Sequence, residues 1–276
     1  MKNNLLLALV VLLYACTEIP PEVNPIGNNP NNNPGQEEPR RVLIEEFSGV
    51  RCVNCPAGSE AIENLLRLYN GRLIAISIHA GFFANPYPDS KYDFRTSDGN
   101  QLLSLLTEPF GYPSAVVNRH RFDGEFGIQL GLSKWAGYIA QEAAEKPRVR
   151  LNLQRTYTPN NRRLDLTVRM DILETLTHPD VRLSVALTED DVEDVQLTPL
   201  GKQADYKHKH VLRDMLSNFD GNPITETKSA GLSLSRTLTY TLPLDWNASN
   251  CKLVAFVHLG GDRKDVLQVA EITILP

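Results

Sequence analysis

Two cysteines separated by two residues are the side chains of this sequence best suited to chemistry. Residues 45–58 read EEFSGVRCVNCPAG and contain Cys52 and Cys55. Such a pair can exchange disulfides, form a static disulfide, or supply two of the four ligands of a zinc ion. A zinc site needs a second pair of ligands, and the only later cysteine is Cys251, far along the chain. Redox exchange and a structural disulfide therefore remain the main alternatives.

The residues around the pair predict a strand, a tight turn and a helix that position it. The run RVLIEEF is nearly all apolar, which is typical of a strand buried on both faces. The stretch PAGSEAIENLLRLYN has apolar residues at helical spacing and ends at Asn70-Gly71. Cys52 is then expected at the helix N-terminus, where free N–H groups and the helix dipole stabilise a thiolate. Arg51 adds to the positive environment, although a solvated turn residue is its simpler interpretation.

This strand, turn and helix resemble the thioredoxin fold. The resemblance implies that Tyr112-Pro113 corresponds to the cis-proline loop that packs against the disulfide. It also implies that Glu46, six residues before Cys52, takes the place of the buried acid that assists proton transfer, with Glu instead of Asp. The separation between Cys52 and Pro113 is longer than in minimal thioredoxins. Residues 81–94, GFFANPYPDSKYDF, account for the extra length and are expected to form a lid or a docking surface.

The body of the chain predicts two kinds of architecture. Over residues 41–147, strands such as RLIAISIHA and YPSAVVNR alternate with amphipathic helices, as in α/β layer folds. Over residues 148–276, helical spacing largely stops, and segments such as RRLDLTVRMDILE alternate polar and apolar residues between turn signals. We therefore expect an α/β thioredoxin-like domain at 41–147, followed by an all-β immunoglobulin-like sandwich domain at 148–276.

The N-terminus predicts export and a lipid anchor. A short apolar run up to Tyr14 is too short to span a bilayer and has the length of a signal-peptide core. It ends in LYAC, which resembles the bacterial lipobox, so residues 1–16 are predicted to be a lipoprotein signal peptide ending at lipidated Cys16. An ordinary signal peptide cut near Ala15 is the alternative. Residues 17–40 are rich in Pro and Asn and predict a disordered tether.

Several features together resemble the Omp28-related outer membrane lipoproteins of the Bacteroidetes type. These features are the predicted anchor and tether, the motif FSGVRCVNCPAG and the later stretch YKHKHVLRDML. The resemblance implies a lipid-anchored protein of the outer membrane, on either its periplasmic or its external face. It implies little about a reaction, because the activity of that family is poorly defined.

Histidines offer one further candidate site. His208 and His210 would share one face of a strand and could bind a transition metal, although hydrogen bonding is the simpler role without a third ligand. His79 ends the second predicted strand and is expected near the disulfide or as a structural residue. Cys251 is expected to be a small buried residue. The stretch after His210 is expected to be a connection that packs on the sandwich or on its neighbour.

Two functions fit the sequence. In the first, the protein exchanges disulfides with protein substrates, with Cys52 as the attacking thiolate and Cys55 as the resolving thiol. The thioredoxin resemblance adds Pro113 as a residue that shapes the substrate groove and Glu46 as a proton relay. In the second, Cys52–Cys55 is the structural disulfide of a non-enzymatic adhesin or binding module with a surface partner.

Other classes of function find no support in the sequence. The net charge of −5 gives no reason to expect nucleic acid binding, which needs clustered Lys and Arg. No phosphate-binding or dinucleotide-binding motif occurs, and no cofactor or metal is predicted. Membrane contact is expected through the lipid anchor at Cys16.

Overall fold

Strands and helices alternate over the first part of the structure, a computed structural model that describes residues 39–275. The elements are β1 (Val42–Ser48), α1 (Cys55–Tyr69), β2 (Leu73–His79), α2 (Ser97–Leu105), β3 (Ser114–Val117), β4 (Leu130–Gly131) and α3 (Trp135–Ala144). All seven residues of β1 and of β2 are buried, because these strands have apolar side chains on both faces. α1 ends where Asn70 adopts the left-handed conformation, with φ of 40°.

These elements have the order and the strand directions of a thioredoxin-like domain. β1 and β2 are parallel, β3 is antiparallel to β1, and β4 is antiparallel to β3. α1 and α3 cover one face of the strands through Ile62, Trp135 and Ile139. α2 covers the other face through Leu102 and Leu103. The arrangement agrees with the thioredoxin-like fold predicted for this part of the chain.

Strands dominate the remaining described residues, as the alternation of polar and apolar residues predicts. They are β5 (Val149–Thr158), β6 (Arg163–Ile172), β7 (Val181–Glu189), β8 (Val192–Thr198), β9 (Gly201–His208), β10 (Val211–Met215), β11 (Asn222–Pro223), β12 (Ser233–Thr241), β13 (Cys251–Leu259) and β14 (Val266–Thr273). Burial alternates along β6, where Leu164, Leu166 and Val168 are buried and their neighbours are not.

One large sheet contains strands from both parts of the chain. β10 lies parallel to β2, with Val211 opposite Ser77, and antiparallel to β7. The nine-stranded sheet has the order β14-β13-β7-β10-β2-β1-β3-β4, with β11 paired to β7. The prediction of a connection after His210 is wrong, because Val211 and Leu212 are buried in a central strand. The described residues, 39–275, therefore belong to a single compact unit.

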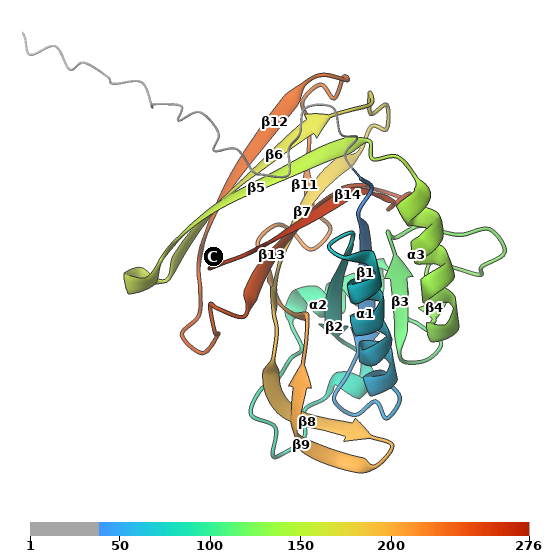
Figure 1. The fold of residues 1–276 in the computed structure, drawn as a ribbon, viewed down its shortest axis with the longest axis vertical. Helices are drawn as coiled ribbons and strands as arrows, with labels where there is room; N and C mark the ends of the chain where they lie inside the picture. The colour runs from blue at the N-terminus through green and yellow to red at the C-terminus, as the bar shows by residue number, and fades with distance from the viewer. Residues whose placement is uncertain (1–38, 276) are drawn as a thin grey trace, which may run out of the picture. The chain divides into compact units, whose positions relative to one another are not determined.

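A second layer of strands covers one side of β7, β13 and β14 (Figure 1). It is a three-stranded sheet of order β12-β6-β5, and Leu166 and Val168 share a core with Leu187 and Leu253. A two-layer sandwich is thus present, but one of its layers continues the thioredoxin-like sheet. For this reason the immunoglobulin-like sandwich is not confirmed, and a domain boundary at residue 147 stays a prediction.

A buried ion pair joins β1 to the loop that follows β3. Arg119 donates through Nε and Nη2 to the two carboxylate oxygens of Glu45, at 2.7 and 2.6 Å. The side chains of Arg119 and Glu45 are 0% and 1% exposed, and the guanidinium lies 4.8 Å from the ring centroid of Phe256 on β13. Both oxygens of Glu45 are therefore satisfied by a charged partner, which is the favourable arrangement for a buried carboxylate.

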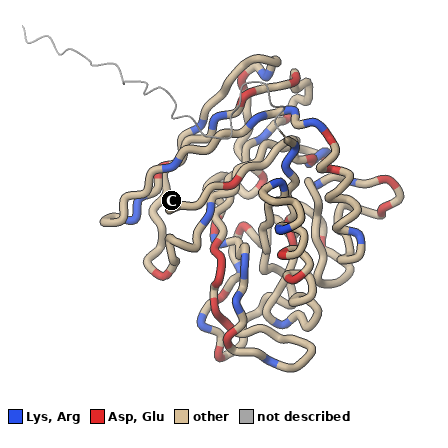
Figure 2. The backbone as a smooth tube through the Cα atoms, in the orientation of Figure 1, with Lys and Arg blue, Asp and Glu red and all other residues tan. Residues whose placement is uncertain are grey.

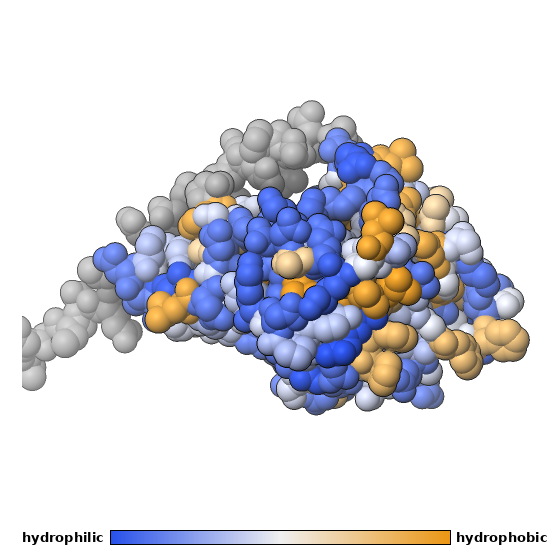
Figure 3. Space-filling model, turned by 90° about the horizontal axis from the view of Figure 1, so that it is seen from below, coloured by the Kyte–Doolittle hydropathy of each residue, from blue (hydrophilic) through white to orange (hydrophobic). Residues whose placement is uncertain are grey.

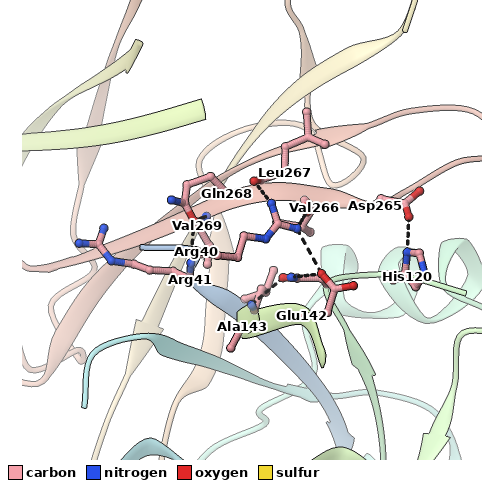
Figure 4. Close-up of polar contacts among 12 residues, drawn as sticks. Arg40, Arg41, His120, Glu142, Ala143, Asp265, Val266, Leu267, Gln268 and Val269 are labelled. Carbon is pink, nitrogen blue, oxygen red and sulfur yellow. Dashed lines mark hydrogen bonds and ion pairs between the residues drawn. The ribbon is translucent and has the colours of Figure 1, made fainter. Parts of the chain in front are cut away.

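The start of β1 is held by Arg40. Figure 4 shows the Arg40 guanidinium beside Glu142 of α3 and the backbone of β14. Arg40 Nη2 donates to Glu142 Oε2 (3.2 Å) and to the Val266 carbonyl oxygen (2.6 Å), and Nη1 donates to the Leu267 carbonyl oxygen. The side chain is therefore anchored to two elements just before the sheet begins.

Two predictions concern residues that the structure does not describe. The signal peptide of residues 1–16, with lipidated Cys16, and most of the tether of residues 17–40 lie outside residues 39–275. Within the described range, no helix is long and apolar enough to cross a membrane.

Candidate functional site

The cysteines of the C-x-x-C motif form a disulfide between the end of β1 and the start of α1. Cys55 is the first residue of α1, which agrees with the predicted helix start. The Cys52 N–H donates to the Gly49 carbonyl oxygen at 3.0 Å and closes the turn. The pair lies at a helix N-terminus, where a thiolate is stabilised. However, Cys52 is only 3% exposed and Cys55 only 1%.

The β8–β9 hairpin covers the C-x-x-C loop. Gln196 on β8 donates through Nε2 to the carbonyl oxygens of Cys52 (3.0 Å) and Gly49 (3.3 Å). The Leu197 N–H donates to the Val50 carbonyl oxygen at 2.8 Å. Figure 1 shows the hairpin beside the N-terminal end of α1. Gln196 has no local signal in the sequence, since 144 positions separate it from Cys52.

The aromatic stretch of residues 81–94 packs against the same loop through Arg51. Arg51 donates through Nε to the Asn85 carbonyl oxygen (2.7 Å) and through Nη2 to that of Pro86 (2.6 Å). Its guanidinium lies 4.2 Å from the ring centroid of Tyr87. Arg51 thus holds the stretch in place, and its interpretation as a solvated turn residue is wrong.

Large apolar side chains are exposed in loops that lead to and from the site. Val53 between the cysteines is 40% exposed, Phe82 after β2 is 77% exposed, and Phe110 before Pro113 is fully exposed. Figure 3 views the molecule from the end at which α1 begins and shows hydrophobic surface gathered on one side of this face. An apolar surface of this kind suits the docking of a protein segment.

Glu46 is buried in β1, beneath the first turns of α1. Its Oε2 accepts a hydrogen bond from Ser77 Oγ at 3.2 Å, whereas its Oε1 has no hydrogen-bond partner among the described residues. Burial raises the pKa of Glu46 to about 8, against the opposite effect of the Ser77 hydrogen bond. The carboxyl is therefore mainly neutral at pH 7 and can donate a proton.

Gly58 allows Glu46 and Pro113 to approach α1. A Cβ at Gly58 would lie 2.6 Å from Glu46 Oε1 and 2.9 Å from Pro113 Cβ. The Tyr112–Pro113 peptide is cis, in agreement with its resemblance to a cis-proline loop. Gly58 lies one turn after Cys55 on the same side of the helix. The disulfide-bearing helix, the buried acid and the cis-proline therefore meet, and a glycine inside a helical pattern is the signal that marks Gly58 in the sequence.

Two buried histidines lie together near the ends of β2 and β9. The ring centroids of His79 and His208 are 5.5 Å apart, and Phe94 packs on both rings at 5.0 and 4.7 Å. Burial lowers the pKa of His79 well below its ordinary value and that of His208 to about 4. Both rings are therefore neutral at pH 7 and belong to a packed aromatic cluster. Neither ring nitrogen of His79 has a hydrogen-bond partner among the described residues, so its structural role stays a prediction.

His210 does not share a face with His208. β9 ends at His208, and His210 follows in a bend with φ of 54°. His210 Nε2 lies 2.9 Å from Glu63 Oε1 on α1, and its Nδ1 lies 3.2 Å from Asp190 Oδ1. The prediction that both histidines lie on one strand face is wrong, because the strand ends between them.

A run of acidic residues extends from the end of β7 into β8 (Figure 2). Neighbouring lysines neutralise part of it, since Lys252 lies 3.0 Å from Asp190 and Lys91 lies 3.0 Å from Glu193. Across residues 39–275, no group of three His, Cys, Asp or Glu side chains could hold a metal ion. The run therefore takes part in ion pairs, and the pair of Glu193 with Lys91 joins the hairpin to the stretch of residues 81–94.

Cys251 is not suited to react as a thiolate. It is fully buried in β13, and burial raises the pKa of its thiol to about 12. It has the predicted role of a small buried residue.

Two solved structures share this fold over most of the chain. HBP35 of Porphyromonas gingivalis has a TM-score of 0.67 at 19% identity, over 87% of this chain and 77% of that chain. Protein AGR_C_4864 from Agrobacterium tumefaciens has a TM-score of 0.56 at 10% identity, over 87% and 96% of the two chains. A domain of the outer membrane lipoprotein Omp28 from Porphyromonas gingivalis has a TM-score of 0.33 at 24% identity, over 46% of this chain and 95% of that domain. No curated protein matches the chain.

A family model provides the assignment. The model described as outer membrane protein Omp28 matches residues 107–275, which are more than half of the 276 residues. The matched region contains the cis-proline, the hairpin over the disulfide and both layers of the sandwich. It confirms the resemblance found in the sequence, and the chain belongs to the Omp28 family of outer membrane proteins.

Proposed function

We propose that this protein is a lipid-anchored outer membrane protein that exchanges disulfides with protein substrates at Cys52 and Cys55. Membership of the Omp28 family supports the outer membrane location, and Cys16 is the proposed site of the anchor. The region matched by the family begins after the C-x-x-C loop, so the chemistry rests on the geometry of the site. The exposed apolar side chains Val53, Phe82 and Phe110 are the proposed docking surface for a substrate.

The observation that carries this proposal is the environment of Glu46. Burying a carboxyl with one unpartnered oxygen lowers the free energy of unfolding unless another benefit compensates for it. A neutral acid beside a disulfide-bearing helix offers such a benefit, because it can supply and take up a proton there. A buried polar group without a hydrogen bond is uncommon in native proteins, and a catalytic role is one explanation for it.

The proposed reaction begins when a substrate thiolate attacks Cys52 Sγ. A bond forms between the two sulfurs, the Cys52–Cys55 bond breaks, and its electron pair leaves on Cys55 Sγ. Glu46 then gives its proton to the Cys55 thiolate. A second substrate thiolate attacks the substrate sulfur of the mixed disulfide and releases Cys52, so the substrate dithiol is oxidised and the protein disulfide is reduced. The reverse steps reduce a substrate disulfide.

The burial of both cysteines favours a second function. With Cys52 only 3% exposed beneath the β8–β9 hairpin, the bond is protected as a structural disulfide would be. The protein would then be a binding module, with the apolar surface as its contact with a partner. Under this second function, replacing both cysteines with alanine should lower the melting temperature and leave partner binding intact.

The reduction potential of the Cys52–Cys55 pair separates the two functions. It is measured by thiol alkylation and mass spectrometry after equilibration in glutathione buffers. Exchange catalysts have potentials of about −120 to −270 mV, and we expect a value in this range. A potential below about −300 mV would identify a disulfide that resists reduction and would favour the binding module.

A trapping experiment tests the exchange itself. Cys55→Ser removes the resolving thiol, so mixed disulfides between Cys52 and substrates should accumulate and appear on non-reducing gels. The double variant Cys52→Ser/Cys55→Ser is the control and should form none. Equal adducts in both variants would contradict the proposed role of Cys52.

A further inference from the structure

The stretch from Tyr206 to His210 has no part in the steps above, yet it lies against α1. Lys209 Nζ lies 2.7 Å from Glu63 Oε2, and His210 Nε2 lies 2.9 Å from Glu63 Oε1. The Tyr206 hydroxyl interacts with the Ser59 side chain. Ser59 and Glu63 are four residues apart and lie on one face of the helix. This stretch therefore packs on the helix that carries the disulfide.

A small cavity lies between this stretch and Glu46. It has room for about one water molecule. Its polar lining consists of Glu46, Ser59, Glu63, Ser77, Lys209 and His210. A surface groove of about 550 Å³ between α1 and β9 shares Ser59, Glu63 and Lys209 with the cavity. The cavity therefore extends from the buried carboxyl to side chains that line the surface.

The chemistry of this lining suits proton transfer. Glu46 lines the cavity and has one carboxyl oxygen without a hydrogen-bond partner in the described residues, so a water molecule there has a buried carboxyl to bind. His210 lines the same cavity, and an imidazole ring has two nitrogens that can donate or accept a proton. The hydrogen bond from His210 lowers the pKa of Glu63 to about 2, so Glu63 remains a carboxylate at pH 7 and orients the ring.

We propose that this cavity is a proton route in which one water molecule, His210 and Glu63 connect the buried carboxyl of Glu46 with solvent. The inference rests on the proposed disulfide exchange and gives the family-matched part of the chain a role in it. When Glu46 has given its proton to the Cys55 thiolate, its carboxylate takes a proton from the water. The water takes one from Glu63, to which His210 Nε2 has passed its proton, because both ring nitrogens face carboxylates. Glu63 also lines the groove, and a proton from there returns to the ring through it. In the reverse reaction the same groups carry the proton outward.

The charged groups around His210 hold its ring in position. Glu63 on α1 binds Nε2, and Asp190, directly after β7, binds Nδ1 at 3.2 Å. Each carboxylate also pairs with a lysine, since Lys209 lies 2.7 Å from Glu63 and Lys252 on β13 lies 3.0 Å from Asp190. The ring is thus fixed between two acids that the lysines partly neutralise, and His210 is the group of this cluster suited to pass protons on.

The rate of disulfide reduction by dithiothreitol tests the route. The rate is measured between pH 6 and 9. At pH 7, the disulfide of His210→Asn should be reduced about five- to tenfold more slowly than that of the unchanged protein, and the two reduction potentials should be equal. Free imidazole in the buffer should restore much of the rate, because it can deliver the missing proton. Equal rates at every pH, or a loss that imidazole does not restore, would overturn the inference.

His120→Asn is the matched control. His120 also binds a carboxylate, with Nδ1 at 2.6 Å from Asp265, but lies on the loop after β3, away from the cavity. Its replacement should leave the reduction rate unchanged. If His120→Asn and His210→Asn slow the reaction equally, the effect is structural and the route is wrong.

Carbon-13 NMR of the labelled Glu46 carboxyl tests the route in the oxidised protein, without any reduction. Near pH 8 both the protonated and the charged form of Glu46 are populated. Exchange between these two forms should be at least about tenfold slower in His210→Asn than in the unchanged protein, and it should also be slower in Glu63→Gln. Unchanged exchange in both variants would overturn the route. A low reduction potential would instead end the proposed exchange function, and the NMR result would still decide the route.

Discussion

Two adjacent glutamates on β1 are buried to the same extent and have opposite surroundings. Glu45 points towards one face of the sheet, where Arg119 binds both of its oxygens. Glu46 points towards α1, where one oxygen accepts a hydrogen bond from Ser77 and the other has no partner in the described structure. Each is 1% exposed, so burial alone does not distinguish them.

The difference shows which acid is structural and which is available for chemistry. A carboxylate with a bidentate guanidinium partner stays charged and contributes to stability only as long as the partner is present. A carboxyl without a charged partner becomes neutral in the folded protein and can exchange a proton at mildly alkaline pH. Three changes test the contrast: removing the charged partner of Glu45, removing the charge of Glu46, and filling the space beside Glu46.

The largest effect is expected from removing the partner of Glu45. Arg119→Met leaves a buried carboxylate without its counter-charge and should lower the free energy of unfolding by about 3–5 kcal/mol. Urea denaturation measures the loss. The double variant Glu45→Leu/Arg119→Met should recover most of it, since both charges are then absent. If Arg119→Met alone is as stable as the unchanged protein, the ion pair does not explain the burial of Glu45.

A smaller effect, with a definite pH dependence, is expected at Glu46. The folded protein keeps this carboxyl protonated up to about pH 8, whereas an unfolded chain releases the proton near its ordinary pKa of 4.5. The folded state thus binds more protons between these values, and stability falls as pH rises from about 4.5 to 8. Glu46→Gln lacks this loss and should be the more stable form by about 2–4 kcal/mol at pH 9. Urea denaturation of both proteins at pH 5, 7 and 9 measures this difference. If the free energy of unfolding changes with pH in the same way for both, Glu46 is charged in the folded protein and the prediction is wrong.

The smallest effect concerns the space beside Glu46. Gly58→Ala places a methyl group against Glu46 Oε1 and Pro113, and should lower the free energy of unfolding by about 1–3 kcal/mol. Gly137→Ala on α3 is the matched control, since no atom lies within 4 Å of its added Cβ, and it should stabilise the protein by about 0.5–1 kcal/mol. Calorimetry should therefore give melting temperatures that shift in opposite directions. Shifts of the same sign would mean that Gly58 is not a packing requirement.

The sequence predicts the parts of this site that depend on local pattern. The strand, the turn and the helix around Cys52 follow from apolar spacing over a few residues, and the resemblance to thioredoxins correctly implies that Glu46 is buried. Gln196 and Arg119 could not be found in this way, because each joins segments that are distant in the chain. The error at His210 has a local cause, since nothing in YKHKH marks the end of β9 before the left-handed residue.

The contacts of Arg40 determine where a pulling force on the N-terminal side of the chain would act on the folded protein. Any chain that precedes Pro39 joins the body at the start of β1, where Arg40 is tied to α3 and β14. The C-x-x-C loop follows the other end of this seven-residue strand, about 23 Å away at the usual rise per residue. A pull from the N-terminal side is therefore taken up by the Arg40 contacts before it reaches the disulfide. The strand acts as a spacer that keeps Cys52 at the opposite end from the point of attachment.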